Sequence, residues 1–474
     1  MAEGAKPFDE MRNGDGGVKP AYRSYCDWFE QQDNDLLKRK HRDAEDQFRR
    51  TGITFNVYGD DEAEERLIPF DMVPRVIDAA DWRKLTRGIE QRVSALNAFM
   101  YDLYHRQEII RAGRIPERLF RQNDAWLSNM VGFTPPGSVY THIVGIDLVR
   151  TADGFFVLED NARTPSGVSY MLENRETMMA MFPDLFMQVP VETVSNYPRR
   201  LAKSLAACAP PKCEGKPLVA VLTPGIYNSA YYEHAFLADQ MGAELVEGSD
   251  LRVVDGRVTM RTTRGYEPVD VLYRRVDDEF LDPLTFNPDS MLGVPGIMDV
   301  YRSGGITIAN APGTGVCDDK AIYSFMPDIV EFYTGEKPLL PNVETWRCAE
   351  EDSLKYVLDN LGELVVKEVH GSGGYGMLIG PTSTKAEIED FRKKIEANPQ
   401  GYIAQPTLSL STCPIFTEAG LAPRHVDLRP YVLVSPDGID ITPGGLTRVA
   451  LEEGSLVVNS SQGGGTKDTW VLKE

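Results

Sequence analysis

Oxygen-bearing side chains gather at the end of a short apolar run in the first third of the chain. Residues 155–158 follow an Asp-Gly turn signal and are typical of a strand. Because side chains alternate along a strand, we expect Glu159 and Asn161 on one face and Asp160 on the other. Residues 145–150 (GIDLVR) are typical of the partner strand of a hairpin. This pairing sets Asp147 across from the Glu159 region, within a residue or so.

These side chains form a candidate magnesium site. Two carboxylates and an amide oxygen are hard ligands, which Mg²⁺ prefers and usually combines with substrate phosphates. Asp147, Glu159 and Asn161 are therefore the candidate metal ligands. The hairpin by itself is equally compatible with an acidic turn in solvent, so the rest of the chain has to decide.

A lysine stands on a predicted strand directly before a glycine-rich stretch. Residues 364–369 (LVVKEV) carry Lys367, and HGSGGYG follows at 370–376 with the spacing G-x-G-x-x-G. A dinucleotide-binding fold needs a helix after such a loop, but residues 377–380 are typical of a strand. The arrangement favours a loop that folds over phosphates with its backbone N–H groups while the lysine adds a charge. A plain glycine hairpin is the alternative.

The other motifs add cations but no nucleophile. Residues 311–315 (APGTG) form a tight glycine loop before Lys320, without the Ser or Thr that a Walker A loop requires. Arg429 and Arg448 lie near the ends of two predicted strands, 427–434 and 445–450. The six histidines are isolated in the sequence, and no Ser-His-Asp set, H-E-x-x-H motif or nucleophile elbow is present. The visible chemistry is that of phosphate and metal.

Composition excludes several classes of function. The chain has 474 residues, of which 42% are hydrophobic, so it can bury a large core, and its length suggests about three domains. A net charge of −21 argues against general binding of nucleic acid or of an anionic membrane. The six cysteines have no zinc spacing, and neither a signal peptide nor a membrane span is evident. We expect a soluble, cytoplasmic protein with reduced thiols.

The N-terminal region, residues 1–125, is predicted to be mostly helical. Residues 1–20 are polar and glycine-rich and are expected to be poorly ordered, whereas 22–50 predicts one or two surface helices. Residues 52–59 are a strand candidate, and 80–112 predicts one long helix. One buried stripe of that helix is formed by Leu96, Phe99, Met100, Leu103 and Tyr104.

A small Rossmann-like domain is predicted between about residues 215 and 312. The run at 218–223 shows no alternation, which favours a strand of a parallel sheet covered on both faces. Asn228 or Ser229 can cap the helix that follows. No glycine-rich fingerprint follows the strand, so a dinucleotide is not expected here. The segments beyond the strand ends, 223–231 and 274–278, are candidates for a substrate-facing rim, with structural ion pairs as the alternative for Arg274 and Arg275.

The whole chain divides into four predicted parts. They are the N-terminal region at 1–125, a metal-binding part at 126–212, the Rossmann-like part at 213–315, and a lysine and glycine-loop part at 316–474. Near the C-terminus, VVNSSQGGGTKDTW at 457–470 is either a floppy tail or a loop that returns to the fold.

In a different order, these parts resemble the ATP-grasp superfamily, in which the strand lysine and glycine loop come first and the metal-binding strands last. Here the metal-binding strands come first, as in a circular permutation. The chain resembles the circularly permuted ATP-grasp type 2 family, which is related to glutathionylspermidine synthetase, from about residue 50 to the C-terminus. The phrases that carry the resemblance are EDNARTPSG, TPGIYNSAYYEHAFLA, YRRVDDEFLDP, PGGLTRVA and NSSQGGGTKDTWV.

The resemblance implies an α/β (α+β) fold, a permuted ATP-grasp domain with a Rossmann-like pre-ATP-grasp domain, and a role for each candidate residue. Arg429 and Arg448 would lie near the γ-phosphate, and Arg163 would hold the transferring phosphoryl group or an acyl phosphate. Asp147, Glu159 and Asn161 would bind Mg²⁺, expected as two ions. The nucleotide would be bound by Lys320, Lys367, Gly373, Gly374, Gly376, Gln405, Asn459 and Gln462. Many relatives have an acid where Gln405 stands near the adenine.

The implied activity is that of an ATP- and Mg²⁺-dependent carboxylate–amine ligase. The γ-phosphoryl group would move to a carboxylate, and an amine would attack the acyl phosphate to give a peptide-like amide. The partners would be a small-molecule or peptide carboxylate and an amine. A non-catalytic nucleotide-binding protein is one alternative. A dinucleotide-dependent oxidoreductase is another, which the missing helix after Gly376 disfavours.

Overall fold

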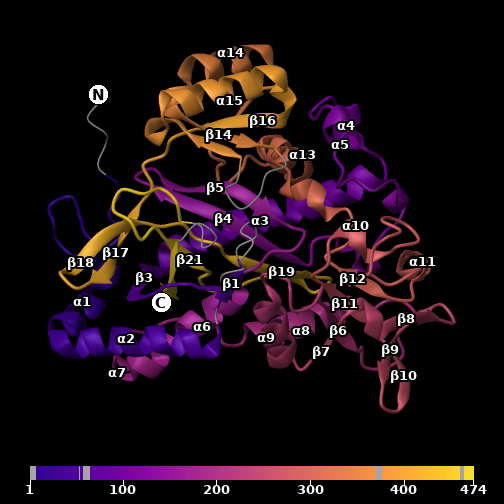
Figure 1. Ribbon diagram of the computed structural model, residues 1–474, viewed down its shortest axis with the longest axis horizontal. Coiled ribbons are helices and arrows are strands. Elements are labelled where there is room, and N and C mark those ends of the chain that lie inside the picture. The colour runs from indigo at the N-terminus through magenta and orange to yellow at the C-terminus, as the bar shows by residue number, and fades with distance from the viewer. Residues whose placement is uncertain (1–6, 53, 57–64, 370–375, 459–463) are drawn as a thin grey trace.

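A computed structural model of the chain describes residues 7–52, 54–56, 65–369, 376–458 and 464–474 (Figure 1). Its α-helices are α1 (Arg23–Glu30), α2 (Asn34–Thr51), α3 (Ala79–Tyr104), α4 (Glu108–Arg111), α5 (Arg118–Arg121), α6 (Val168–Met181), α7 (Pro183–Gln188), α8 (Tyr197–Ala207), α9 (Tyr231–Met241), α10 (Asp278–Leu281), α11 (Ile297–Arg302), α12 (Lys320–Tyr323), α13 (Met326–Thr334), α14 (Glu351–Asn360) and α15 (Lys385–Ala397).

The strands form several small sheets. They are β1 (Thr54–Asn56), β2 (Glu65–Leu67), β3 (Phe70–Ile77), β4 (Ile143–Thr151), β5 (Gly154–Asn161), β6 (Val219–Leu222), β7 (Glu244–Val246), β8 (Leu251–Val254), β9 (Arg257–Thr262), β10 (Gly265–Pro268), β11 (Val271–Arg274), β12 (Thr307–Ala309), β13 (Trp346–Arg347), β14 (Leu364–Glu368), β15 (Met377–Ile379), β16 (Tyr402–Pro406), β17 (Thr412–Thr417), β18 (Gly420–His425), β19 (Tyr431–Ser435), β20 (Gly438–Ile441), β21 (Thr447–Val449) and β22 (Gly465–Val471).

The sheets at the centre of the fold join segments from both ends of the chain. One has the antiparallel order β20-β19-β4-β5, so the predicted hairpin β4–β5 pairs directly with a strand from the C-terminal part. Another has the order β21-β22-β3, in which β22 runs parallel to β3. Strand β22 is buried throughout, which confirms that the glycine-rich C-terminal segment returns to the fold. Early and late segments of the chain therefore share the same sheets.

The predicted Rossmann-like sheet is present, with the all-parallel order β12-β11-β6-β7. Helices α8 and α9 pack on it, and Gly242 ends α9 in the left-handed region, as the sequence predicts. The predicted cap is wrong: α9 begins at Tyr231 after Ala230, without a side-chain cap. Asn228 instead accepts a hydrogen bond from the backbone N–H of Ala230, which shapes the turn before the helix.

A separate unit carries the predicted lysine strand. Its antiparallel sheet has the order β13-β16-β14-β15, and α14 and α15 belong to the same unit, at the top of Figure 1. The unit has its own apolar core, formed by residues such as Val357, Leu364, Val366, Leu378 and Ile395. Strand β15 follows Gly376, so the chain does not enter a helix there. The divisions at 125/126, 212/213 and 315/316 stay predictions.

The long helix predicted at 80–112 is interrupted. Helix α3 ends at Tyr104, and Gln107 takes a left-handed conformation with φ 55°. The Asp102 carboxylate then accepts hydrogen bonds from the backbone N–H groups of Glu108 and Ile109, at 2.8 and 3.0 Å, and α4 begins there. The Asp102 side chain, which belongs to α3, therefore caps α4. The predicted buried stripe of α3 is confirmed.

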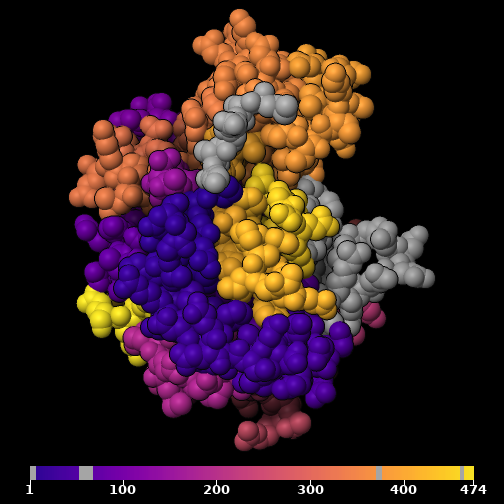
Figure 2. All heavy atoms as spheres, turned by 90° about the vertical axis from the view of Figure 1, so that its left-hand side faces the viewer, coloured from indigo at the N-terminus to yellow at the C-terminus, as the bar shows by residue number. Residues whose placement is uncertain are grey.

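The prediction for the N-terminal arm is wrong for its described part. Glu10 and Met11 are buried, and the backbone N–H of Glu10 donates to the Thr412 carbonyl. Figure 2 shows the indigo N-terminal region lying against the yellow and orange C-terminal region. The Glu10 carboxylate pairs with the buried Arg75 guanidinium, which also donates to the Asp427 carbonyl. Polar composition suggested disorder, but one buried ion pair fixes the arm.

Two smaller points complete the fold. The predicted strand at 52–59 is observed only as β1, because residues 53 and 57–59 lie outside the described residues. In the part of the chain that the structure covers, no helix is both long enough and apolar enough to cross a bilayer.

The Glu10–Arg75 pair gives a test of the arm. Glu10→Ala leaves a buried guanidinium without its carboxylate, so we expect the free energy of unfolding to fall by about 3–5 kcal/mol. Urea denaturation at neutral pH measures the change. In the control Asp46→Ala, the ion pair that is lost is exposed (Arg49–Asp46, 3.1 Å), and we expect a change below about 0.5 kcal/mol. Equal small losses in both variants would show that the arm contributes no stability.

Candidate active site

The predicted site residues of the described chain, except Gly376, meet in one cavity of about 630 Å³. It is bounded by the β4–β5 hairpin, by the lysine unit and by the segment that precedes α12. The predicted residues that line it are Asp147, Glu159, Asn161, Arg163, Lys320, Lys367, Gln405, Arg429 and Arg448. Gly376 does not line the cavity, and its backbone oxygen accepts from the N–H of Glu368. Gly373, Gly374, Asn459 and Gln462 lie outside the described residues.

The hairpin has the predicted register. Asp147 pairs directly with Glu159 and Gly145 with Asn161, and a bulge follows Asp147. Asp160 points to the opposite face, where the Arg92 guanidinium donates to both of its oxygens at 2.7 and 2.6 Å. The alternation along β5 therefore sends two oxygen-bearing side chains into the cavity and uses the third to anchor the strand to α3.

Two arginines engage the Asp147 carboxylate, which is buried. Arg429 pairs with both of its oxygens, and the Arg448 guanidinium donates to Oδ2 at 2.8 Å. Burial alone would raise the pKa of Asp147, but Arg429 and Arg448 outweigh it, so this pKa lies well below its usual range. Asp147 is therefore ionised and shared with arginine, whereas the sequence suggested a carboxylate open to a metal.

Asp427, which the sequence patterns did not single out, also lines the cavity and holds one of its arginines. Its carboxylate accepts hydrogen bonds from Arg448, with Nε 3.0 Å from each oxygen. Its backbone carbonyl accepts from Arg75 at 2.9 Å, which links the N-terminal arm to this arginine. An acid two residues before Arg429 was the available signal, but only the bridge between Val426 and Val449 brings it beside Arg448.

Two lysines from different elements line the cavity. Lys320 begins α12, and its ammonium lies 4.0 Å from the Glu159 carboxylate. The Lys367 ammonium donates to Gln405 Oε1 at 2.8 Å, and the Gln405 amide donates to the Thr345 hydroxyl at 3.0 Å. Burial lowers the pKa of Lys367 to about 8, against the opposing charge of Glu159 and with the repulsion of Lys320. Two lysine ammonium groups therefore lie near the Glu159 carboxylate in this cavity.

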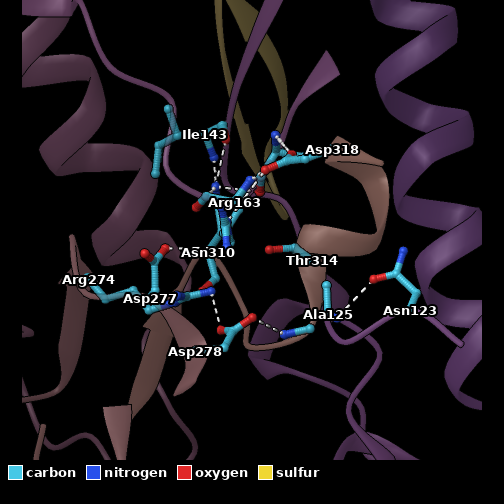
Figure 3. Close-up of polar contacts among 12 residues, drawn as sticks. Asn123, Ala125, Ile143, Arg163, Arg274, Asp277, Asp278, Asn310, Thr314 and Asp318 are labelled. Atoms are coloured by element: carbon cyan, nitrogen blue, oxygen red, sulfur yellow. Dashed lines mark hydrogen bonds and ion pairs between the residues drawn. The ribbon is translucent and has the colours of Figure 1, made fainter. Parts of the chain in front are cut away.

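Arg163 lies between two carboxylates, as Figure 3 shows. Its guanidinium is 3.5 Å from Asp277 and 3.7 Å from Asp318, so neither pair is a tight hydrogen bond. Burial alone would lower the pKa of Arg163, but these carboxylates raise it, so the residue is charged. Arg163 is held loosely and is available to a further anion.

The loop that carries Arg163 is held by the Rossmann-like part of the chain. One oxygen of the Glu233 carboxylate accepts from the N–H of Gly167 (2.7 Å) and from the N–H and hydroxyl of Ser169 (3.1 and 2.9 Å), and so caps α6. Arg275 donates to the Pro165 carbonyl at 2.7 Å and pairs with Glu233. Neither residue lines the cavity. Glu233 was not anticipated.

In the predicted substrate-facing rim at 274–278, the two arginines are buried. Arg274 is fully buried and donates to the carbonyls of Asn310 and Val276, and it pairs with Asp278. Arg275 is buried against the loop described above. The alternative, that these arginines are structural, therefore describes them better, because both guanidinium groups are already used by the fold.

The donor set fits a hard cation bound at the hairpin. Glu159 and Asn161 present oxygens to the cavity, and Asp147 lies beside them with its negative charge intact. No three His, Cys, Asp or Glu side chains cluster as a metal site within the described ranges. The predicted ligand set is of a different kind, because it combines the carboxylates of Asp147 and Glu159 with the amide of Asn161. The remaining coordination positions of the ion would be filled by phosphate oxygens.

Comparisons with known proteins agree with this geometry. The family model described as circularly permuted ATP-grasp type 2 matches residues 74–450. An uncharacterized protein of Synechocystis is 51% identical over 467 residues, with 98% of this chain and 97% of that protein covered. A Frankia alni protein, provisionally named glutamate–cysteine ligase 2-3, is 41% identical over 469 residues. That match covers 98% of this chain but 54% of the Frankia protein.

The fold also resembles a solved structure. The apo form of a glutathione synthetase-like effector from Globodera pallida superposes with a TM-score of 0.58 at 12% identity, covering 93% of this chain and 98% of that one. At this identity the likeness concerns the fold alone. It confirms the expected mixed helix and sheet architecture, and with the family match it confirms the resemblance inferred from the motifs. The chain belongs to the circularly permuted ATP-grasp type 2 family.

Proposed function

We propose that this protein is an ATP- and Mg²⁺-dependent ligase that joins a carboxylate to an amine through an acyl phosphate. One observation carries the proposal: two lysines, three arginines and a set of hard oxygen donors line a single cavity. No described lining residue is a histidine or cysteine. Phosphoryl transfer needs positioning and charge more than a protein nucleophile, so this composition suits it.

The nucleotide would lie between the hairpin and the lysine unit. Lys320 and Lys367 both lie near Glu159, and their charges would neutralise a triphosphate there. Apolar residues that also line the cavity, Val343, Val365, Ile379 and Leu408, would accept a base. Gln405 offers an amide beside them, so it can meet adenine or ribose in place of the acid found in many relatives.

The arginines would act in the first half-reaction. Arg429 and Arg448 are fixed by Asp147, Asp427 and the Ser166 carbonyl, so they need not reorganise when negative charge develops on the transferring phosphoryl group. Mg²⁺, when bound, supplies further neutralisation of the phosphate oxygens. Glu159 and Asn161 would hold that ion, with Asp147 contributing its charge.

The second half-reaction would use Arg163. Its loosely held guanidinium can pair with the phosphate of the acyl phosphate while an amine attacks the acyl carbon. The lysine unit has its own core, so it can close as a body and keep water from the intermediate. The carboxylate would be a small molecule or the end of a peptide. The ligase name of the Frankia relative concerns a longer protein and does not identify the substrates.

The alternative functions require different features of the protein. A dinucleotide oxidoreductase needs a helix after G-x-G-x-x-G, whereas β15 follows here. A non-catalytic nucleotide-binding protein would use the same lysines but would have no need of an arginine pair fixed beside the metal ligands. ADP release separates that reading from the ligase.

Removing the Glu159 charge tests the ligase proposal. Glu159→Gln keeps the shape of the side chain but loses a charged metal donor, so we expect ATP turnover to fall about 100-fold or more. The assay is ADP release with Mg²⁺-ATP and a panel of amino acids, peptides and polyamines. Glu396→Gln, on the exposed face of α15, is the matched control and should keep turnover within about twofold.

Two outcomes would contradict the proposal. If Mg²⁺-ATP raises the melting temperature but no panel member releases ADP, the protein binds nucleotide without this catalysis. If Mg²⁺-ATP leaves the melting temperature unchanged and NAD raises it, the ligase proposal is wrong.

The lowered pKa of Lys367 predicts proton uptake on nucleotide binding. With a pKa of about 8 the unliganded amine is mostly neutral at about pH 9 and charged at about pH 6.5. Bound phosphates raise this pKa, so binding should take up close to one proton at about pH 9 and almost none at about pH 6.5. Calorimetry in buffers of different ionisation enthalpy measures the uptake.

Lysine variants provide the controls for this measurement. Lys367→Met should abolish the uptake, while Lys393→Met, exposed on α15, should retain it. Uptake that is equal at both pH values, or that survives in Lys367→Met, would show that Lys367 is not at the phosphates.

A further inference from the structure

Asp318 is a further carboxylate that lines the cavity. Asp318 ends the short 3₁₀ turn Thr314–Asp318, directly before α12, and lines the cavity beside Arg163. Its Oδ1 accepts hydrogen bonds from the backbone N–H groups of Ala162 (2.5 Å) and Arg163 (3.2 Å). Its Oδ2 lies 3.7 Å from Arg163 Nε, and no donor from the described residues is within hydrogen-bonding distance of it. One oxygen anchors the residue and the other remains able to accept a proton.

The surroundings of Asp318 are rich in negative charge. Arg163 is the cation nearest to Asp318 and lowers its pKa, whereas the Glu159 carboxylate on β5 raises it. Around Arg163 itself lie Asp277, Asp278 and Glu279, from the segment before and within α10. Figure 3 shows Asp277 and Asp278 on the side of Arg163 away from Asp318. Carboxylates therefore flank Arg163 on both sides, and the Asp318 carboxylate at the cavity wall suits a positively charged substrate group.

Burial gives the carboxyl the proton affinity that a general base needs. It raises the pKa of Asp318 to about 7, with a smaller contribution from Glu159, against the opposing effects of Arg163 and of the two backbone N–H groups. A carboxyl in that range takes up and releases a proton near neutral pH.

We propose that Asp318 is a catalytic residue of the second half-reaction, where it accepts the proton of an aliphatic amine that enters the cavity as an ammonium ion. The inference rests on the proposed ligase function and names the class of its nitrogen substrate. An ammonium ion has no lone pair, so an amine of this class cannot attack until a proton has left it. Asp318 lies beside Arg163, the residue proposed to hold the acyl phosphate. It can therefore remove the proton at the place where the amine attacks.

The ammonium gives one proton to Asp318 Oδ2 and becomes a neutral amine. Its nitrogen lone pair forms a bond to the acyl carbon, and the bond from that carbon to the phosphate oxygen breaks with its electron pair on the phosphate. The second N–H proton leaves with the phosphate, and Asp318 later returns its proton to solvent. The products are an amide and inorganic phosphate, and no oxidant or reductant is needed.

Hydroxylamine separates this role from a structural one. It is largely uncharged at neutral pH, so it can attack an acyl phosphate without a base, and the hydroxamate product is measured directly. Asp318→Asn keeps an oxygen that can accept from Ala162 and Arg163. With this variant we expect amide formation from the best amine of the panel to fall about 100-fold at neutral pH, and hydroxamate formation to stay within about threefold of the wild type.

Asp277→Asn is the matched control, because it removes the same charge from beside Arg163 at a position that does not line the cavity. Any effect of this variant should be equal for the two nucleophiles. Parallel loss of both reactions in Asp318→Asn, or loss of neither, would overturn the proposal. A wild-type protein that forms no hydroxamate from any carboxylate with Mg²⁺-ATP would refute the ligase function itself, and Asp318 catalysis with it.

The wild-type protein gives an independent readout if Asp318→Asn does not fold. The ratio of amide to hydroxamate formation should fall as the pH is lowered through about 7, because Asp318 becomes protonated. A ratio that follows only the titration of the free amine, with no step near neutral pH, would contradict the assignment.

Discussion

The buried carboxylate of Asp147 is the constraint on which the site depends. A buried charge is costly unless it is paired, and two arginines from distant segments meet that requirement. Arg429 and Arg448 then have fixed positions without any ligand, and Asp427 holds the second of them from the other side. The cluster thereby arranges the cations before a phosphate arrives, and it keeps Asp147 ionised beside the other oxygen donors of the hairpin.

Strand pairing is what brings this cluster together. The β4–β5 hairpin comes early in the chain, yet its partners, β19 and the bridge from Leu148 to Leu428, belong to the C-terminal part. The same principle acts at the edges of the site, where the N-terminal arm contacts Asp427 through Arg75 and the Rossmann-like part holds the loop after β5 through Glu233. Each part of the permuted chain contributes contacts that hold the same cavity. The permutation therefore changes the order of the parts in the sequence but keeps the site residues together.

Local sequence patterns predicted the parts of the site that local geometry decides. Alternation along β5 placed Glu159 apart from Asp160, and the Asp-Gly turn set the register with Asp147. Long-range partners had no such signal. The pairing of Asp147 with Arg448, the capping of α6 by Glu233 and the burial of Glu10 all depend on contacts between segments far apart in sequence. A polar residue that has no partner nearby in the sequence is predicted to be exposed, although the tertiary fold can bury it against a distant partner.

The most direct test of the account is a crystal structure of the full chain with Mg²⁺ and a non-hydrolysable ATP analogue. The account predicts that the triphosphate lies between Lys320 and Lys367, with a metal ion bound to Glu159 and Asn161. The γ-phosphate should contact Arg448 or Arg429. A nucleotide bound at the strand ends of the parallel β12-β11-β6-β7 sheet, with the hairpin cavity free of phosphate, would contradict it.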